Sequence, residues 1–488
     1  MSLTLALSNA VTGLRAMTAQ SEAISNNVAN ALTEGYARKE VALSPEAPGG
    51  TGAGVGIDGV TRAVAPALAD ALRLAASDSG DAKTRADALA RIAAAVGEPG
   101  AEGALSSRAD ALERALSAAA DTPESPQLLS AATAAAGDYA DKINQVANEA
   151  MALRSEADAS IARQVAAIND AIANIEAMND EIRSRMVTGA DITALEDQRD
   201  RMIRTVSDMV PVRVIPREQG TVALFTKNGA QLLDGKVFTL TFEATLLVTP
   251  DQSIASGALS GLEVNGVPIP IGEGGGRGLM DGGSLSAAFE MRDRVIPAIT
   301  ADLDDLAADL ALRTQGLSAD PTLSPGDAGL FTDDGAAFDP VNLLGLSRRI
   351  RLNPAVDPGA GGAVHRLRDG IGAAAPGDVG AEGVLRGLQD ALGALVAAPA
   401  ISGLTGTRDA SGFAASFSAG ALTASSSAEA EAVFRRGRVD ELNDSALAKT
   451  GVDSDQELTR LMAVEQAFAA NARVVSAIDE LMRRVIDL

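Results

Sequence analysis

The chain has 488 residues, of which 46% are hydrophobic, so it can form two or three domains with real cores and is not wholly disordered. Aromatic residues make up only 2% and tryptophan is absent. A core must therefore consist of Ala, Leu, Ile, Val and Met, which favours an Ala-rich helical bundle. The formal charge of -24 argues against a nucleic-acid partner, because phosphate binding needs a basic stripe.

No apolar run reaches the ~18 residues that a membrane span needs, so we expect no membrane insertion. The N-terminus lacks a cationic segment followed by an apolar block, which argues against a cleaved secretory signal. Cysteine is absent, so the sequence gives no indication of the redox compartment. Export by another route stays open.

The first thirty residues predict an amphipathic helix. Its apolar positions alternate spacings of four and three, which is a heptad pattern. This seam consists of Leu3, Leu7, Ala10, Leu14, Met17, Ser21, Ile24, Val28 and Ala31. A turn is expected directly afterwards, over Thr33 to Tyr36, because a type II turn needs φ > 0 at its third position and Gly35 occupies it.

Three asparagines lie near the end of this helix. If Ile24 and Val28 face inward, Asn27 falls beside the apolar stripe, while Asn26 and Asn30 lie on the outer side. Facing water, they would be a neutral fray before the turn. Facing neighbouring copies of the chain, their amides both donate and accept hydrogen bonds and could fix the register between like helices.

Helices also dominate the next segment. A short helix is expected near Leu105 to Ala120. A very long one is predicted from Pro123 to Val187, because Thr122 suits an N-cap and proline suits the first helical position.

A further helix should open with a capping box from Thr193 to Glu196. On it, Asp197 and Asp200 are spaced to pair with Arg201 and Arg204 at i,i+4, so these carboxylates predict surface ion pairs rather than catalysis.

The segment Val210 to Ile271 predicts a small β domain. Its short apolar runs are separated by Asn228-Gly229, Asp234-Gly235 and Asn265-Gly266, which are hairpin signals. The glycine-rich run Gly272 to Gly278 lacks the Lys-Ser/Thr ending of a phosphate-binding loop. Helical periodicity resumes afterwards, so the β domain is an insertion.

The C-terminal part begins with a Pro/Gly-rich passage, Leu317 to Gly383, in which RRIRLN predicts a short strand. Helices are then expected near Val384 to Ala397 and from about Ser425. The last segment repeats the heptad pattern of the N-terminus. Its seam consists of Leu458, Leu461, Val464, Phe468, Ala472, Val475, Ile478, Met482 and Val485.

Each terminal helix needs a partner, because an unpaired apolar stripe forgoes roughly 1.5 to 3 kcal/mol for each large side chain left unburied. The two helices can pair with each other, with other copies, or with both; ordinary packing on the chain's own core is the alternative. We therefore predict a mainly α protein with an inserted small β domain and a nested layout. Its domains are a paired terminal coiled-coil inner domain (1–62 and 440–488), a long-helix bundle (63–209 and 279–439, with the loop-rich segment 317–383) and an outer β domain (210–278).

No residues suggest an active site. The single histidine, His365, has no cysteine to share a zinc site with, and Asp333-Asp334-Gly335 lacks the other ligands of a calcium loop. We expect no catalytic, cofactor-binding or metal-binding residues, and no cofactor.

Both ends of the chain resemble one protein family. NNVANALTEGYAR, Asn26 to Arg38, is similar to the NNxANANTPGYSR motif of bacterial flagellar axial proteins, and Gly451 to Leu488 is similar to their C-terminal motif. The Gly-Tyr-x-Arg ending, LEDQRD at Leu195 to Asp200, and RLNPAVDPG at Arg351 to Gly359 are most similar to the hook-associated protein 1 (FlgK) family. The departures from the pattern are Leu32 for Asn, Glu34 for Pro, Ala37 for Ser, and Phe468 for the common Tyr.

The resemblance implies a structural protein of the extracellular flagellum at the junction of hook and filament, secreted through the flagellar type III apparatus. Its implied partners are further copies in a ring or tube, the hook protein, the adjacent hook-associated protein on the filament side, and a cytoplasmic export chaperone near the C-terminus. Hook and distal-rod proteins share both motifs, but have mostly β middles. A coiled-coil adhesin or a peptidoglycan-cleaving enzyme would need a binding or catalytic constellation that this sequence lacks.

The expected assembly interface combines residues of the two seams with residues of the motifs at both ends of the chain. It consists of Leu3, Leu7, Leu14, Met17, Ile24, Asn26, Asn27, Val28, Asn30, Gly35, Tyr36, Arg38, Leu458, Leu461, Phe468, Asn471, Val475, Ile478, Met482 and Val485.

Overall fold

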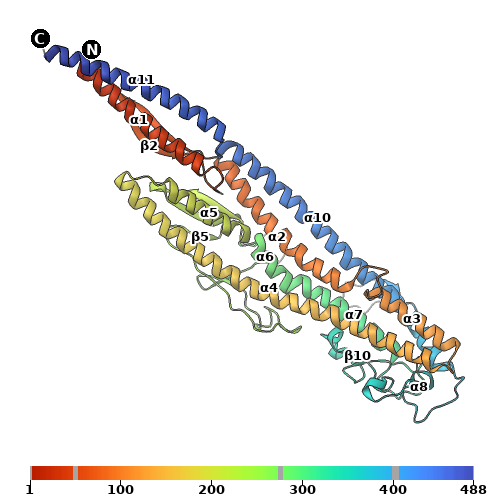
Figure 1. The fold of residues 1–488 in the computed structure, drawn as a ribbon. Helices are drawn as coiled ribbons and strands as arrows, with labels where there is room; N and C mark the ends of the chain where they lie inside the picture. The colour runs from red at the N-terminus through yellow and green to blue at the C-terminus, as the bar shows by residue number, and fades with distance from the viewer. Residues whose placement is uncertain (1–2, 34, 48–52, 273–277, 398–405, 487–488) are drawn as a thin grey trace. The chain divides into compact units, whose positions relative to one another are not determined.

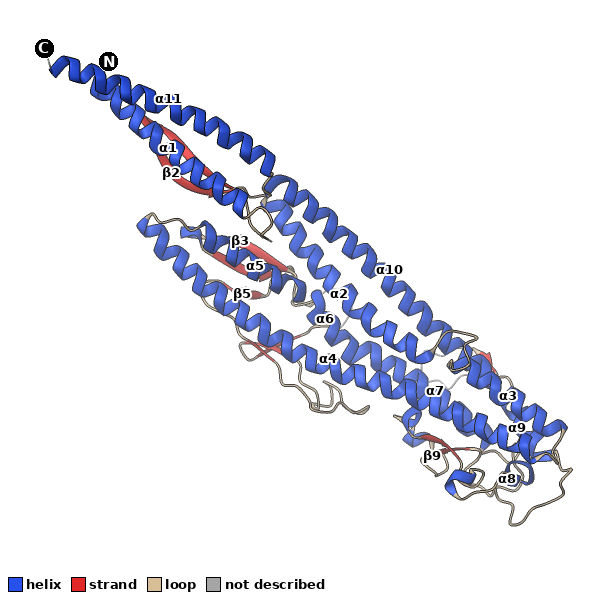
Figure 2. Cartoon of the chain, in the orientation of Figure 1, coloured by secondary structure: helices blue, strands red, loops and turns tan. Residues whose placement is uncertain are grey.

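The computed structural model describes residues 3–33, 35–47, 53–272, 278–397 and 406–486. Glu34, most of the glycine-rich run and the last two residues lie outside this range, as does the side chain of Val485. The described chain is mainly helical with small antiparallel sheets, which confirms the fold class at this level (Figures 1 and 2).

The helices account for most of the elements. They are α1 (Leu3–Ala29), α2 (Pro66–Val96), α3 (Leu105–Asp121), α4 (Pro126–Thr188), α5 (Thr193–Met209), α6 (Gly283–Glu290), α7 (Ile296–Thr314), α8 (His365–Asp369), α9 (Gly383–Gly393), α10 (Ala410–Thr450) and α11 (Ser454–Ile486). A π-helical turn, η3 (Met291–Val295), joins α6 to α7.

The strands are short and pair antiparallel throughout. They are β1 (Lys39–Glu46), β2 (Gly54–Arg62), β3 (Val212–Pro216), β4 (Val222–Thr226), β5 (Gln231–Leu233), β6 (Leu240–Thr241), β7 (Leu262–Val264), β8 (Val267–Ile269), β9 (Phe331–Asp333), β10 (Ile350–Leu352), β11 (Val396–Ala397) and β12 (Thr407–Arg408). β1 and β2 form a hairpin, β3-β4-β5 and β6-β7-β8 form three-stranded sheets, and β9-β10 and β11-β12 form pairs.

The chain divides into two compact units. Unit 1 comprises Met1–Asp78, Ala167–Thr239 and Arg435–Leu488, and unit 2 comprises Ser79–Ala166 and Leu240–Phe434. The sheet β3-β4-β5 therefore belongs to unit 1 and the sheet β6-β7-β8 to unit 2. The region 210–278 thus contains two separate sheets, and the three sequence-based domain limits stay predictions.

The long helix α4 is present, but it begins at Pro126 instead of Pro123. Thr122 is the C-cap of α3, and the Ser125 hydroxyl accepts a hydrogen bond from the Leu128 N–H at 3.4 Å, so the second proline of the segment takes the first helical position. Its apolar stripe is buried except for the half-buried Ala157, and consists of Tyr139, Ile143, Val146, Ala150, Leu153, Ala157, Ile161, Ile168, Ile175 and Ile182. In unit 1 this stripe supplies Ile168, Ile175 and Ile182, which are fully enclosed.

The predicted capping box of α5 does not form. The carboxylate of Asp191 accepts the Thr193 N–H at 2.8 Å, while the Thr193 hydroxyl is buried without a recorded partner. Glu196 is engaged elsewhere, by Arg62. The first turn of α5 is thus capped by the side chain of Asp191 and not by that of Thr193.

Two C-terminal boundaries also differ from the predictions. α10 begins at Ala410 and not near Ser425, because Phe413, Ala414 and Phe417 are buried in the core of unit 2 although the Ala/Ser/Gly-rich sequence has weak periodicity. α9 ends at Gly393, before the predicted Ala397.

Two of the three hairpin signals are confirmed, whereas Asp234-Gly235 closes only an isolated bridge between Leu233 and Val237. Asn228-Gly229 connects β4 to β5, and Asn265-Gly266 connects β7 to β8 with φ of 50° and 76°, as a type I′ turn requires. The predicted strand in RRIRLN is β10. The β1-β2 hairpin was not predicted, because Pro45 and the lack of an Asn-Gly signal hide it.

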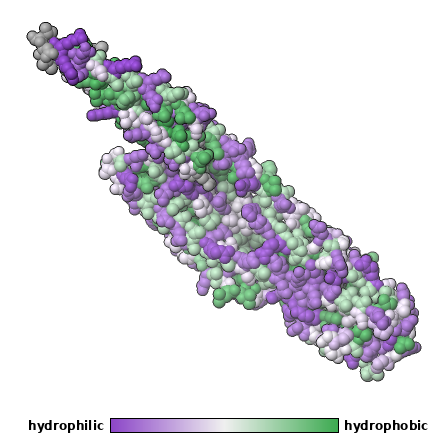
Figure 3. All heavy atoms as spheres, viewed as in Figure 1, coloured by the Kyte–Doolittle hydropathy of each residue, from purple (hydrophilic) through white to green (hydrophobic). Residues whose placement is uncertain are grey.

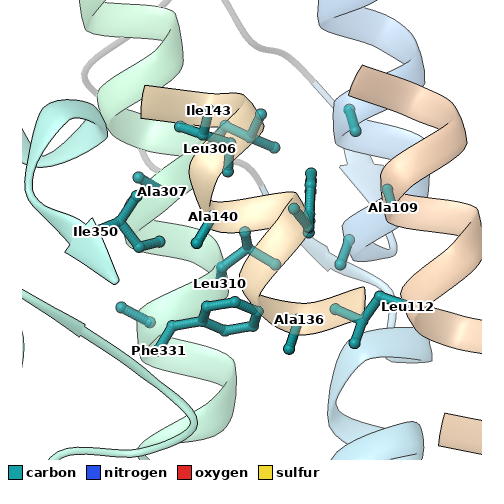
Figure 4. Close-up of a cluster of buried hydrophobic side chains, with 14 of the residues drawn as sticks. Ala109, Leu112, Ala136, Ala140, Ile143, Leu306, Ala307, Leu310, Phe331 and Ile350 are labelled. Carbon is teal, nitrogen blue, oxygen red and sulfur yellow. The ribbon is translucent and has the colours of Figure 1, made fainter. Parts of the chain in front are cut away.

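The core of unit 2 includes side chains of α3, α4 and α7 and of the strand pair β9-β10 (Figure 4). Ile143 of α4 and Leu306 of α7 are both fully buried, and Phe331 of β9 closes the cluster. Alanines such as Ala136 and Ala140 line the contact, so the helices approach closely, as the aromatic-poor composition indicates. Within the described segments, no helix is long and apolar enough to cross a membrane.

Candidate functional site

In unit 1 the two ends of the chain lie side by side. α1 and α11 pack antiparallel, with both termini at the same end (Figure 1). The approach is close: a Cβ added to Gly13 would lie 2.9 Å from the side-chain nitrogen of Asn471. The terminal helices therefore pair within one chain, and a glycine makes this spacing possible.

The face that α1 buries is made mostly of small residues. It consists of Ala10, Gly13, Ala16, Ala23, Ile24 and Asn27, and it packs against α11 and the β1-β2 hairpin. The larger side chains of the predicted seam are offset from it. Leu7, Leu14 and Met17 are only half-buried, and Val28, predicted to face inward, is 37% exposed. Small residues occupy the inner face because they allow both α11 and the β1-β2 hairpin to pack closely against α1.

On α11 the predicted seam is divided in the same way. Ile478 is buried, and Leu461, Val475 and Met482 are half-buried, whereas Leu458 is 49% and Phe468 43% exposed. Figure 3 shows hydrophobic residues gathered on the visible surface of these terminal helices. Packing within one chain thus leaves part of both seams open.

An open groove of about 700 Å³ runs between the outer sides of α1 and α11. Phe468 and Met17 supply its largest apolar walls, and its α1 side is otherwise made of small or polar side chains. The lining consists of Met17, Thr18, Ser21, Glu22, Ser25, Asn26, Ala29, Val464, Glu465 and Phe468. This groove, called here the terminal groove, lies entirely within unit 1.

Asn27 closes the base of the helix pair. Its side chain is fully buried, and its amide nitrogen donates to the Lys39 carbonyl and to a carboxylate oxygen of Glu457, both at 2.9 Å. Its amide oxygen accepts the Tyr36 hydroxyl at 2.9 Å and the Lys39 N–H at 2.8 Å. All four hydrogen-bonding positions of the amide are used, so α1, β1 and α11 meet at one side chain.

This result corrects the sequence-based placement of the asparagines. Asn27 does not lie beside the stripe but is buried, because Glu457 and the backbone of Lys39 satisfy it. Asn26 is exposed and lines the terminal groove. Asn30 is half-buried, and its amide nitrogen donates to the Asn26 carbonyl at 2.9 Å, which helps to end the helix.

The predicted turn follows directly. The Tyr36 N–H donates to the Thr33 carbonyl at 3.1 Å, and Gly35 has φ of 74°, where other residues are strained. The turn type depends on Glu34, which lies outside the described residues. Beyond it, the Arg38 N–H donates to the Thr450 carbonyl at 2.9 Å, so β1 starts against the end of α10.

A second polar node fixes the hairpin to α5. Arg62, the last residue of β2, donates to Glu196 at 2.9 Å, Asp197 at 2.7 Å and Asp200 at 3.0 Å, with its side chain only 9% exposed. Burial lowers the pKa of Arg62, but the charges of Asp200, Glu196 and Asp197 outweigh it and raise that pKa. Asp197 and Asp200 were predicted to pair with arginines on their own helix; the hairpin arginine binds them instead.

Among the described residues, no group of three or more His, Cys, Asp or Glu side chains is placed to hold a metal ion. The arrangement offers a helix pair with an open groove and partly exposed seams.

The Asn27 network predicts a specific double-mutant cycle. Asn27→Asp places a second carboxylate against buried Glu457 and should reduce the free energy of opening α1 by about 3 kcal/mol. Adding Glu457→Gln restores an amide-to-carboxylate hydrogen bond with the roles reversed and should recover part of that loss. Native-state hydrogen exchange of the α1 amides measures both; equal protection in Asn27→Asp and the unmodified protein would refute the role of the network.

Tyr36 predicts a distinctive alkaline titration. Burial, helped by the negative charges of Asp197, Glu457 and Asp191, raises the pKa of Tyr36 to about 12. Burial also raises the pKa of Tyr139, the second of the two tyrosines, far above its usual range. The stability due to a neutral Tyr36 is complete below the unfolded pKa of about 10 and is lost as pH rises towards 12.

The native protein should therefore show no tyrosinate absorbance near pH 10, whereas the urea-unfolded protein ionises both phenols there. Tyr36→Phe should remove the first absorbance step above that pH. Ionisation of one tyrosine in the native protein at about pH 10 would contradict the burial of this hydroxyl.

Comparisons with known proteins identify the family. The family model described as the flagellar hook-associated protein FlgK helical domain matches residues 70–322, and the flagellar basal body rod FlgEFG protein C-terminal model matches residues 443–488. The chain is similar to flagellar hook-associated protein 1 of Bacillus subtilis, with 23% identity over 98% of this chain and 97% of that one.

Two further relatives match over shorter stretches. Flagellar hook-associated protein 1 of Salmonella typhimurium is 28% identical over 64% of this chain, and the match spans 57% of that protein. The solved structure of the flagellar hook junction protein FlgK from Burkholderia pseudomallei aligns with a TM-score of 0.43 and 20% identity, over 54% of this chain and 46% of that one. Because a family model specific to the FlgK helical domain matches more than half of the sequence, the chain belongs to the FlgK family of flagellar hook-associated proteins.

Proposed function

We propose that this protein is a structural component of the bacterial flagellum that adapts the hook to the filament at their junction. Family membership supports this role, and the open apolar surface of the terminal helices is the observation that carries it. Phe468, Leu458 and Val28 are exposed on the paired helices α1 and α11, and apolar side chains exposed in this way are suited to assembly.

The middle of the chain distinguishes this role from that of a hook or distal-rod protein. Those proteins share the terminal motifs, but we expect the middle part of their chains to consist mostly of β-strands. Here the middle contains the 63-residue helix α4 and matches the FlgK helical domain. The alternative is therefore not favoured.

The proposed assembly is a ring or tube of identical copies. The paired terminal helices form its inner coiled-coil layer, the helical bundle the next, and the β segments the outside, in the nested layout expected from the sequence. The intrachain pairing of α1 with α11 supports this layout, because it brings both ends of the chain to one place.

The proposed partners are the hook protein, the adjacent hook-associated protein on the filament side, and an export chaperone near the C-terminus. The chain would leave the cell through the flagellar export apparatus and would need neither cofactor nor membrane insertion. The exposed apolar residues of α11, such as Met462 and Phe468, support a chaperone, because they need cover before assembly.

A strain lacking the gene should therefore secrete filament subunits while its intact hooks stay bare. When the gene is returned to this strain with the change Phe468→Asp, filaments should also fail to grow. The exposed phenyl group of Phe468 contributes to the assembly surface more than to the fold. Val187→Asp, at a side chain that is 79% exposed near the end of α4, is the matched control and should leave filaments normal. Electron microscopy of cells decides, and filaments on the deletion strain would exclude the junction role.

A further inference from the structure

α11 carries a second apolar stripe beside the first seam. Its members repeat at spacings of four and three, like the first seam, but none belongs to that seam. They are Ala463, Ala467, Ala470, Val474, Ala477 and Leu481. Val474 is 46% and Leu481 48% exposed, so packing within the chain leaves this stripe uncovered. It is called here the outer stripe.

The terminal groove and the outer stripe have matching shapes. On its α1 side the groove presents Thr18, Ser21, Ser25 and Ala29, which leave room for another helix. The outer stripe consists mainly of alanine, so a helix backbone can approach closely, while Val474 and Leu481 supply the larger knobs. A helix with a narrow apolar face can therefore pack into a groove that is lined by small side chains.

Their charges are also complementary. Glu22 and Glu465 are exposed at the groove and form no ion pair within the described part of the chain. Arg473, next to Val474 at the edge of the outer stripe, is likewise exposed and without an ion pair among the described residues. Most other charged residues of α11, such as Arg483 and Arg484, already pair with a neighbour on the same helix.

We propose that the outer stripe of one copy docks into the terminal groove of a second copy, with Arg473 against Glu22 and Glu465. The two faces differ, so the contact is heterologous and repeats from copy to copy into a ring or tube. The apolar heptads alone would allow shifts of seven residues, and the arginine selects one of them. The inference rests on the proposed junction role and names the two surfaces that build it.

Cysteine cross-linking tests the contact directly, because the chain has no cysteine of its own. Ser25→Cys marks the groove, Ala470→Cys marks the outer stripe, and Glu218→Cys on an exposed turn of unit 1 is the control. Full-length variants are expressed as the sole copies in cells, and isolated hook-filament junctions are treated with a short bis-maleimide.

Co-expressed Ser25→Cys and Ala470→Cys chains should give cross-linked dimers, whereas either variant alone, or Ser25→Cys with Glu218→Cys, should stay monomeric. A chain with both Ser25→Cys and Ala470→Cys should give a ladder of higher oligomers. The proposal is overturned if junctions that support filaments give no mixed dimer, or if either single variant cross-links to itself.

A charge exchange provides an independent test. Arg473→Glu, or Glu22→Arg combined with Glu465→Arg, should reduce the number of filaments per cell several-fold, and the chain carrying all three changes should recover most of them. Arg163→Glu, at an exposed arginine of α4 without an ion pair in the described structure, is the control. If the chain with all three changes regains filaments, misfolding cannot explain why the other charge variants lose them.

If the gene-deletion strain loses filaments but every charge variant grows them normally, the docking proposal fails while the junction role stands. If the deletion strain keeps its filaments, the junction role itself fails.

Discussion

The buried amide of Asn27 is the contact on which the terminal region depends. It joins the end of α1 to the start of β1 and to the first turn of α11, segments that are up to 430 positions apart in the sequence. Because all four hydrogen bonds of this amide are made, losing any partner leaves a buried polar group unpaired, which is destabilising. It therefore fixes the relative height of the two helices where apolar contacts alone would permit sliding.

The second constraint is the division of labour between small and large side chains. Alanine and glycine occupy the inner face of α1, where α11 and the hairpin both pack closely. The larger residues of the same helix, such as Leu14 and Met17, are consequently only half-buried and border an open groove. The fold of one chain and the proposed assembly of many thus draw on different residues of the same helix.

Local patterns in the sequence predicted the elements well, and long-range partners poorly. Heptad spacing predicted α1 and α11, and Gly35 predicted the turn, because these depend on neighbours in the chain. The same pattern could not show which polar residue finds a partner. Asn27 was placed beside the stripe because Glu457 is invisible to a local rule, and Arg62 was missed because its carboxylates lie over 130 positions away.

We propose that α1 and α11 of one chain stay paired through Asn27 in the assembly and that neighbouring copies contact them through the open apolar faces. A structure of the isolated hook-filament junction by electron cryomicroscopy tests this most directly. We expect Asn27 and Glu457 of the same chain to remain hydrogen-bonded, with a neighbour's helix in the terminal groove. Terminal helices that separate within each chain and pair instead with other copies, leaving Asn27 away from Glu457, would contradict it.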